Sequence, residues 1–310
     1  MEKKDKILVL GGTGLVGSNL LNELRKQGYT NLLSPRHHQL DLLNFDEVVD
    51  YFYYNQIDNV FLCAARVGGI NANDKYSADF IMENTIIQTN VIRVSHRFKV
   101  KKLLMLGSSC IYPKECSIPI KEEYLLTGPL EKTNLAYAMA KLNGIVMCQM
   151  FRKQYKDNFI CVMPTNLHGK CDSYDLETSH VFPALIRKIH EAKINHSESI
   201  TLWGTGEPKR EFLFVEDLAE ALIFLMNNYN ESEIINVGTG EEISILELTK
   251  LMCEIIGYDG KIIFDSSKPN GTMRKVMDVS KINKLGWKAK TTLQEGIKKT
   301  YKYFLEEFYN

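Results

Sequence analysis

Near its N-terminus the chain reads K-I-L-V-L-G-G-T-G-L-V-G, residues 6–17. The apolar run that ends at Leu10 is typical of a strand buried on both faces of a parallel sheet. The glycines that follow allow a tight turn and a close approach of the backbone to a pyrophosphate. Residues 18–27 have the spacing of an amphipathic helix, whose first N–H groups attract an anion. Strand, glycine-rich turn and helix in this order predict a dinucleotide site; an ordinary turn between a strand and a helix is the alternative.

The second strand of such a unit is expected to end near residues 31–33, and S-P-R-H-H follows at 34–38. A dinucleotide fold that prefers NAD usually carries an acidic residue here, which binds the ribose 2′-hydroxyl. This chain has Arg36 and His37 instead. We therefore expect NADPH rather than NADH, with a basic, solvated loop as the alternative.

Further apolar runs predict the remaining strands of a parallel sheet. They lie at residues 59–65, 102–106 and 159–163, and a helical pattern covers residues 78–98. Ala64 and Ala65 are small residues at the end of the first run, and they leave room for a cofactor at the sheet edge. Residues 66–73 are expected to form a glycine-bearing loop.

Beyond residue 165 the alternation of strand and helix breaks. Helices are expected at 181–194, 217–227, 244–256 and 293–308, with short strands at 198–203, 211–215, 234–237 and 262–264. The sequence therefore predicts an α/β protein with a Rossmann-type doubly wound parallel sheet over residues 1–165. A smaller C-terminal α+β lobe over residues 166–310 is expected to bind the substrate, and segments near 212–240 are expected to return to the first domain.

The formal charge of the chain is balanced, because its 38 Lys and Arg residues equal its 38 Asp and Glu residues. No global field favours nucleic acid or an anionic membrane, and no apolar stretch is long enough to cross a bilayer or form a signal segment. The seven cysteines include no C-x-x-C pair. We therefore expect a reduced, cytoplasmic protein without a disulfide scaffold, a metal site, or nucleic acid or membrane partners.

A second informative stretch, N-L-A-Y-A-M-A-K-L at residues 134–142, consists mainly of good helix formers. Tyr137 and Lys141 are four residues apart and therefore share one helix face. A fixed positive charge beside a phenol stabilises the phenolate, which proton transfer near pH 7 requires. An interfacial tyrosine beside a solvated lysine is the alternative.

The strand at 102–106 runs into G-S-S-C-I-Y-P, residues 107–113. If this segment is extended, Ser108 and Cys110 are two residues apart and face the same pocket. Ligands of open α/β sheets bind at the carboxyl ends of the strands, where this segment is expected.

Together these stretches resemble the extended short-chain dehydrogenase/reductase superfamily, and within it the GDP-L-fucose synthase family. The resemblance spans essentially the whole chain, and its S-S-C and S-H-V elements are specific to this subfamily. It rests on R-V-G-G-I at 66–70, G-S-S-C-I-Y-P at 107–113, P-T-N-L at 164–167, S-H-V at 179–181, W-G-T-G at 203–206, R-E-F at 210–212 and N-V-G-T-G at 236–240.

The resemblance implies an NADPH-dependent enzyme that converts GDP-4-keto-6-deoxy-D-mannose to GDP-L-fucose. Protons on C3 and C5 are α to the C4 ketone, so each can be removed to give an enediolate before hydride reaches C4. By resemblance, Ser108 and Tyr137 hold the C4 oxygen, Tyr137 gives the final proton, and Lys141 lowers the pKa of Tyr137 and binds the nicotinamide ribose. Cys110 and His180 exchange the protons; a buried small hydrophobe and a helix-start histidine are the alternatives for these two.

Cofactor contacts are expected from the glycine turn, from the segment after the second strand and from the later strand ends. These residues are Gly11, Gly12, Thr13, Gly14, Leu15, Val16, Gly17, Arg36, His37, Asp41, Leu42, Ala64, Ala65, Leu106, Gly107, Ser109, Pro164, Thr165, Asn166 and Leu167. The resemblance also implies that the GDP moiety of a GDP-sugar contacts Lys188, Trp203, Arg210 and Asn270, and that the protein is a homodimer.

Three departures from the family pattern concern the sugar, the base and the cofactor. H-G-K at 168–170 stands where the family usually has Tyr-Gly-Pro, beside the sugar pocket. Asn270 stands where bacterial relatives often have Asp, and an amide accepts only through its oxygen, so a weaker preference for guanine is expected. Thr13 stands where relatives can carry Arg, which leaves the 2′-phosphate to Arg36 and His37.

Three other functions stay open. The first is a C4-reductase of a related GDP-4-keto-6-deoxy-heptose with little or no epimerase activity. The second, an NAD-dependent epimerase without net redox, is disfavoured by the basic end of the second strand. The third, an inactive NADP-binding regulatory protein, is disfavoured because Ser108, Tyr137 and Lys141 are all present.

Overall fold

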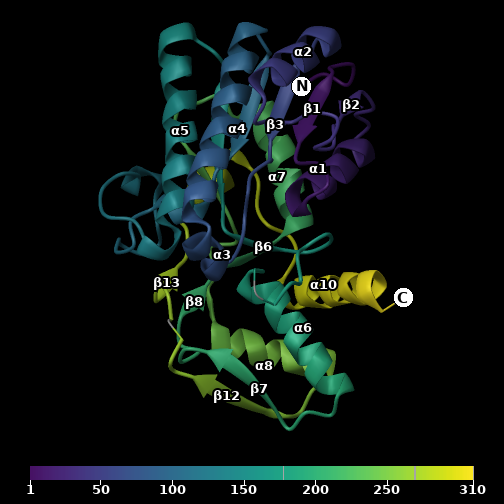
Figure 1. Cartoon of the computed structure of the whole chain (residues 1–310), viewed down its shortest axis with the longest axis vertical. Coiled ribbons are helices and arrows are strands. Elements are labelled where there is room, and N and C mark those ends of the chain that lie inside the picture. Colours follow the sequence, from purple (N-terminus) through teal and green to yellow (C-terminus); the bar gives the residue numbers. More distant parts are fainter. Residues whose placement is uncertain (177, 269, 310) are drawn as a thin grey trace.

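A six-stranded, all-parallel sheet lies at the centre of the first half of the chain (Figure 1). The computed structural model describes residues 1–176, 178–268 and 270–309, so residue 269 of the tail loop lies outside the described residues. The strand order is β10-β5-β4-β3-β1-β2. The strands are β1 (Ile7–Leu10), β2 (Leu32–Leu33), β3 (Asn59–Leu62), β4 (Lys102–Leu106), β5 (Phe159–Pro164) and β10 (Ile235–Val237).

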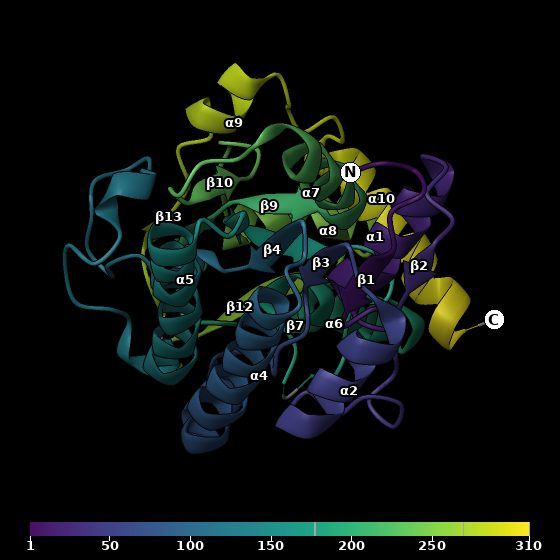
Figure 2. The same cartoon turned by 90° about the horizontal axis from the view of Figure 1, so that it is seen from above.

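Alternate residues of each strand are buried in two different helix layers, which Figure 2 shows on opposite sides of the sheet. Leu8 and Leu10 pack in one core with α2 (Phe45–Asn55), α4 (Ser77–Arg97) and α5 (Leu135–Tyr155). Ile7 and Val9 pack in another with α1 (Leu15–Lys26) and α7 (Val215–Asn228). Because burying one leucine is worth about 2 kcal/mol, strands that are apolar on both faces require a helix layer on each side. Within the described residues, none of the helices combines the length and the apolar character needed to cross a bilayer.

Sequence periodicity predicts most of these elements. β4, α6 (Val181–Ile194) and α10 (Leu293–Phe308) have the expected bounds. Helix α2 is missing from the sequence-based expectation, because its aromatic and β-branched residues hide the helical period. Its N-cap residue is Asn44, whose side chain accepts hydrogen bonds from two backbone N–H groups of the first turn. The loop expected at residues 66–73 is wrong in part, because α3 (Ile70–Lys75) begins within it.

The second half of the chain adds three small sheets and a separate core (Figure 1). β6 (Asn166–His168) pairs with β9 (Phe212–Phe214), and β7 (Ser199–Trp203) pairs with β12 (Lys261–Asp265). β8 (Lys209–Arg210) pairs with β11 (Ile243–Ser244) and β13 (Arg274–Lys275). Helices α6, α8 (Ile245–Ile256) and α10 enclose the core, and α9 (Ser280–Leu285) precedes α10. By contrast, α7 packs on α1 and β10 pairs with β5, so both lie with the large sheet.

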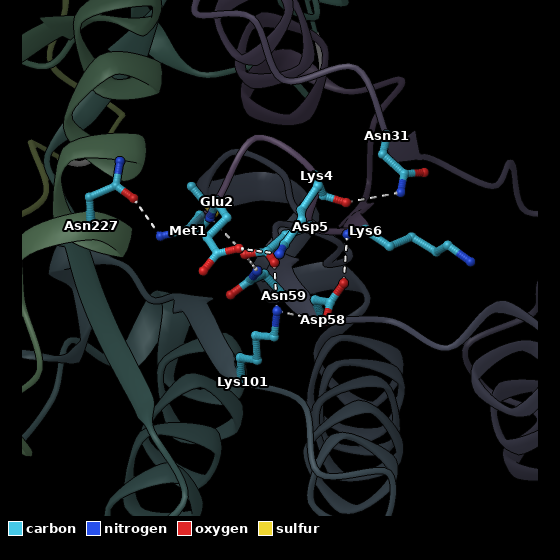
Figure 3. A network of polar contacts seen from close by, with 10 residues as sticks. All are labelled: Met1, Glu2, Lys4, Asp5, Lys6, Asn31, Asp58, Asn59, Lys101 and Asn227. Atoms are coloured by element: carbon cyan, nitrogen blue, oxygen red, sulfur yellow. Dashed lines mark hydrogen bonds and ion pairs between the residues drawn. The ribbon is translucent and has the colours of Figure 1, made fainter.

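A polar network joins the amino ends of three central strands (Figure 3). Asp5 accepts hydrogen bonds from the Glu2 backbone nitrogen and the Asn59 side chain. The Lys101 ammonium lies 2.6 Å from Asp5 Oδ1 and 3.0 Å from Asp58 Oδ1. Burial opposes ionisation of Asp5, but the ammonium and the two N–H donors hold its pKa below the usual range. The polar groups at the amino ends of these strands are therefore paired with one another. A ligand is expected at the opposite edge of the sheet, where the strands have their carboxyl ends.

Candidate active site

The glycine-rich turn between β1 and α1 lies at the carboxyl edge of the sheet. Gly11 has a φ of +86°, and a Cβ there would lie 2.8 Å from the Ala64 backbone nitrogen. A Cβ on Gly17 would collide with the carbonyl oxygen of Gly11. Helix α1 begins without a side-chain cap at Gly14 and without an acidic residue in its first turn. Its N–H groups and positive end are therefore available to an anion, and the turn fits the pyrophosphate of a dinucleotide.

The basic segment after β2 begins beside this turn, because a Cβ on Gly12 would collide with the Ser34 hydroxyl. Arg36 and His37 are both exposed. His37 Nε2 lies 3.8 Å from Asp41 Oδ1, whereas no carboxylate among the described residues pairs with the Arg36 guanidinium. At least one cation at this edge is thus free to meet a phosphate group.

Tyr137 and Lys141 lie on the first turns of α5, at the inner side of the helix. The Lys141 ammonium is buried, donates to the Leu106 carbonyl at 2.7 Å and lies 5.7 Å from the centre of the Tyr137 ring. Burial lowers the pKa of Lys141 to about 8. The pKa of Tyr137 is not lowered in this structure, contrary to expectation. Burial, followed by the Cys110 thiol, raises the pKa of Tyr137.

Ser108 and Cys110 do not lie in one extended segment, which corrects the sequence-based expectation. Ser108 is extended, with φ −162° and ψ 149°, but it caps a 3₁₀ helix, η1 (Ser109–Ile111). Its hydroxyl oxygen accepts a hydrogen bond from the Cys110 backbone nitrogen at 3.3 Å. Burial raises the pKa of the Cys110 thiol, while Lys275, the Ser108 hydroxyl and Lys141 oppose that rise. The cap, rather than strand alternation, therefore brings the hydroxyl and the thiol into one neighbourhood with the α5 residues.

His180 is the N-cap residue of α6, and its side chain caps no backbone N–H group. The preceding loop is held against the R-V-G-G segment, since Gly69 N donates to Thr178 O at 2.7 Å. His180 is exposed, but desolvation by nearby protein atoms, followed by the charge of Lys275, lowers the pKa of its imidazole. His180 is therefore neutral near pH 7 and able to accept a proton.

Lys275 is a site residue that the sequence analysis missed. It lies on the two-residue strand β13, directly opposite Arg210 of β8. The charge of its half-buried ammonium opposes the rise in the pKa of Cys110 and lowers the pKa of His180. Burial lowers the pKa of Lys275. No local pattern marks a single lysine in so short a strand, so only the pairing of β13 with β8 could have identified it.

Lys188 and Trp203 lie together outside the large sheet, on α6 and β7. The Trp203 ring is 45 % exposed, with the Lys188 ammonium 5.5 Å and the Lys268 ammonium 5.4 Å from its centre. Lys268 was not expected from the sequence. Trp203 therefore offers an exposed ring with two cations close to it, which suits a flat group attached to phosphates.

The amide of Asn270 is already engaged within the protein. Its Oδ1 atom accepts hydrogen bonds from the Thr205 backbone nitrogen at 2.8 Å and the Thr205 hydroxyl at 3.3 Å. The expectation that this oxygen accepts a hydrogen bond from guanine is therefore wrong for this arrangement, because Thr205 in the loop after β7 already donates to it. The side chain presents its NH₂ group, a donor, to any ligand.

The remaining cofactor candidates lie at the carboxyl ends of β3, β4 and β5. Thr165 Oγ1 and Asn166 Nδ2 both donate to the Glu211 carbonyl, at 3.2 and 2.7 Å. Asn90 Nδ2 donates to the Leu42 carbonyl at 2.9 Å. Ala64 and Ala65 follow β3, Gly107 and Ser109 follow β4, and Pro164 ends β5 before Leu167. These positions share the sheet edge of the glycine turn, whereas Lys188, Trp203 and Asn270 belong to the second half of the chain.

A model of the NAD dependent epimerase/dehydratase family matches residues 7–238. The chain is 51% identical over 306 residues to the putative GDP-L-fucose synthase 2 of Arabidopsis thaliana. This match covers 99% of this chain and 93% of that protein. It is 43% identical to the GDP-L-fucose synthase of Escherichia coli (strain K12), over 98% of this chain and 97% of that protein. The structure of MlghC, a GDP-mannoheptose C4 reductase from Campylobacter jejuni with NADP bound, is similar with a TM-score of 0.89 and 37% identity, over 98% of this chain and 99% of that chain. The chain belongs to the NAD dependent epimerase/dehydratase family and, within it, to the GDP-L-fucose synthases.

Proposed function

We propose that the chain is an NADPH-dependent epimerase/reductase that converts GDP-4-keto-6-deoxy-D-mannose to GDP-L-fucose. The observation that carries this proposal is full-length identity of 51% and 43% to two proteins named GDP-L-fucose synthase. The grouping of Cys110, Lys141 and Tyr137 around the end of β4 supports it. In this proposal residues 1–165, with the returning α7 and β10, bind the cofactor, and the rest binds the GDP-sugar.

NADPH supplies the hydride for C4 when it is bound. The glycine turn and the start of α1 receive its pyrophosphate, and Arg36 and His37 receive the 2′-phosphate. The absence of an acidic residue directly after β2 supports NADPH over NADH, as does the NADP in the related MlghC structure. Lys141 binds the nicotinamide ribose beside the Leu106 carbonyl.

Epimerisation uses Cys110 and His180 as the proton-exchange pair. One of them removes the proton from C3 or C5, and the electron pair moves onto the C4 oxygen to give an enediolate. The other returns a proton to the same carbon from the opposite face. Ser108 and Tyr137 donate hydrogen bonds to the C4 oxygen while it carries the charge.

Reduction uses the same C4 oxygen. Burial keeps Tyr137 protonated in the free enzyme, which is the form that can donate a proton. As hydride reaches C4, Tyr137 gives its proton to the developing alkoxide, and the Lys141 ammonium stabilises the phenolate that remains. Ser108 holds the oxygen in place during the transfer.

Lys188, Arg210, Trp203 and Asn270 bind the GDP moiety in this proposal. The cations meet the diphosphate, and the exposed Trp203 ring offers a surface for the base. Burial lowers the pKa of Arg210, but a guanidinium stays charged at pH 7.

A homodimer is part of the proposal. Helices α4 and α5 lie side by side in both views (Figures 1 and 2) and pack closely on each other. They carry several exposed apolar side chains, namely Ile81, Met82, Leu135, Met139 and Met150. Apolar residues on two adjacent helices suit a helix-to-helix contact between two copies.

A second candidate function is C4 reduction of a related GDP-4-keto-6-deoxy-heptose with little or no epimerisation. The similarity to the structure of a GDP-mannoheptose C4 reductase favours it. In that case Cys110 and His180 are present but idle.

One experiment separates these functions. The purified chain is incubated in D₂O with GDP-4-keto-6-deoxy-D-mannose, first without and then with NADPH, and the products are followed by NMR. We expect deuterium at C3 and C5 in the first stage and GDP-L-fucose in the second. Reduction without deuterium at either carbon would favour the heptose reductase. Binding of NADPH without oxidation by any GDP-4-keto sugar would leave only a binding protein.

A further inference from the structure

Arg210 lies in a three-stranded sheet with the order β11-β8-β13, of which β8 and β13 appear below the large sheet in Figure 1. On one face of this sheet, Lys209 and Arg274 are register partners, and both pair with Glu242. Arg210 is the next residue of β8, so its side chain starts from the opposite face. Its guanidinium donates to the Lys209 carbonyl at 2.8 Å and pairs with no carboxylate of the described residues. The charge of Arg210 is therefore available to a phosphate group.

Glu211 directly follows Arg210, and it is completely buried. Its Oε1 atom accepts a hydrogen bond from Gly240 N, and its Oε2 atom accepts one from Met277 N, both at 2.9 Å. Gly240 lies shortly before β11, and Met277 lies shortly after β13. One carboxylate thus holds the segments next to all three strands of the sheet that carries Arg210.

The backbone of Glu211 connects this sheet to the expected cofactor edge. Its carbonyl accepts hydrogen bonds from Thr165 Oγ1 at 3.2 Å and from Asn166 Nδ2 at 2.7 Å, directly after β5. Thr165 N donates in turn to Val237 O, the last residue of β10, at 3.1 Å. Glu211 therefore fixes the sheet of Arg210 relative to the carboxyl ends of β5 and β10.

The contacts of Glu211 require a carboxylate at this position. An ionised carboxylate accepts through both oxygens, whereas a glutamine of the same length would turn its NH₂ group toward one of the two N–H donors. Burial raises the pKa of Glu211, and the N–H groups of Gly240, Met277 and Thr239 oppose that rise because they favour the ionised form. A Cβ on Gly238 would collide with Oε1, so the glycine leaves room for the carboxylate.

We propose that Glu211 is a positioning residue for the diphosphate of the nucleotide sugar, because it fixes the place of Arg210 relative to the cofactor edge. The inference rests on the proposed function, since it explains how that substrate is held. Both oxygens of the Glu211 carboxylate are engaged by backbone N–H groups, so its effect on the nucleotide passes through Arg210. If the sheet loosens, the guanidinium moves relative to the phosphate oxygens, and its hydrogen bonds weaken as their distances and angles change.

The test is a double-mutant cycle on nucleotide affinity. Binding of GDP and of NADPH is measured by calorimetry for the wild type, E211Q, R210M and the double variant. E211Q and R210M are each expected to raise the Kd for GDP about tenfold, because each costs a charge-assisted hydrogen bond to the nucleotide. The double variant is expected to lose no more than R210M alone, since without the guanidinium there is nothing left to position. The Kd for NADPH is expected to stay unchanged, because E211Q keeps the carbonyl that holds Thr165 and Asn166.

Kinetics with the nucleotide sugar provide a second measurement. Loss of binding that is equal in the ground state and the transition state raises KM and leaves kcat in place, and this is the result expected for E211Q. G238A displaces the carboxylate without changing its charge and is expected to have the same effect on GDP binding. It replaces E211Q in the cycle with R210M if E211Q is too unstable to assay.

D217N is the matched control. Asp217 is a second buried carboxylate that accepts from backbone N–H groups, those of Lys290 and Thr291. It lies on α7, outside the sheet of Arg210. We expect D217N to bind GDP and NADPH as the wild type does.

Three results would count against the inference or its basis. Normal GDP binding by E211Q, or a loss in the double variant equal to both single losses combined, would show that Glu211 does not act through Arg210. Equal weakening of GDP and NADPH binding in E211Q would reduce Glu211 to a residue that stabilises the fold. A wild type that binds NADPH but not GDP would instead refute the proposed function, and the inference with it.

Discussion

Tyr137 and Lys141 differ in what burial does to them. Burial raises the pKa of the phenol and lowers that of the ammonium to about 8, so both groups are driven toward their uncharged forms. For a proton donor the uncharged phenol is the useful state. The lysine becomes a partner of the phenolate only when the proton leaves, which is the moment at which the reaction needs it.

Tyr137→Phe is expected to abolish reduction while leaving NADPH affinity largely unchanged. The change removes one oxygen and keeps the ring, which packs edge-on against Phe80 with centres 6.3 Å apart. Loss of a general acid lowers the rate about 10²- to 10⁴-fold. Oxidation of NADPH, followed by its absorbance, and calorimetric binding measure the two effects, with Tyr124→Phe as the control. Near-normal turnover of the variant would refute the assigned role.

Asn270→Asp is expected to strengthen the preference for guanine. One carboxylate oxygen can still accept from the Thr205 backbone nitrogen, as the amide oxygen does at 2.8 Å, and the second oxygen becomes an acceptor for the base. A hydrogen bond to a charged group contributes about 1.5–3 kcal/mol, so we expect GDP to bind about tenfold more tightly. Inhibition by GDP is compared with inhibition by inosine diphosphate, which lacks the 2-amino group. An unchanged ratio between the two nucleotides would place the base elsewhere.

At the scale of elements, the turn between β1 and α1 depends on the absence of side chains. Gly17→Ala is expected to destabilise the fold by about 1–3 kcal/mol, because its Cβ would collide with the Gly11 carbonyl oxygen. Gly14→Ala is the matched control, since its Cβ would lie 3.6 Å from the same oxygen, an ordinary contact. Thermal melting and NADPH titration measure both variants. Equal melting temperatures for the two would contradict this account of the turn.

Helix α10 is anchored to β6 through a buried histidine. Thr300 Oγ1 donates to Gly296 O, so it accepts from His168 Nδ1, with both contacts at 2.8 Å. The imidazole stacks on Phe182 with ring centres 3.9 Å apart, and a Cβ on Gly296 would lie 2.6 Å from it. Burial lowers the pKa of His168 to about 3, which keeps the ring neutral in the folded protein.

This anchor makes stability depend on pH. The folded pKa of His168 lies below the unfolded value of about 6.5. The unfolded chain therefore binds the extra proton first, and stability is complete above pH 6.5 and declines as the pH falls toward 3. Between pH 6.5 and pH 5 the loss amounts to about 2 kcal/mol. His168→Gln is expected to remove this part of the slope in denaturant unfolding at pH 7 and pH 5; an unchanged slope would contradict the assignment.

At the scale of the whole molecule, the exposed apolar side chains of α4 and α5 lead to a prediction about assembly. Met82→Lys combined with Met139→Lys is expected to convert a dimer into a monomer, because two like charges would be buried in the contact. Sedimentation measures the mass, and the exposed Met273, which lies on neither helix, provides the control Met273→Lys. A wild type that sediments as a monomer would remove the dimer from the proposal.

Much of the architecture follows from local pattern. The run before Leu10, the glycine turn, β4 and the helices α6 and α10 are all recognisable from residue spacing, because strand and helix periods and turn chemistry act over a few residues. Helix α2 was not predicted, because its aromatic residues obscure the helical spacing of apolar positions. The extended geometry expected around Cys110 is wrong because a serine cap starts a 3₁₀ helix there.

The sequence alone identified most residues of the candidate site, from the glycine turn to Tyr137 and Lys141. Each of these motifs spans only a few residues of the chain. Only the packing of distant segments decided how the charges meet. Lys275 lies opposite Arg210 through the pairing of β13 with β8, and the Asn270 oxygen accepts a hydrogen bond from the Thr205 backbone nitrogen, 65 residues away. Electrostatic interactions depend on distance in space and on burial, and neither quantity is encoded by position along the chain.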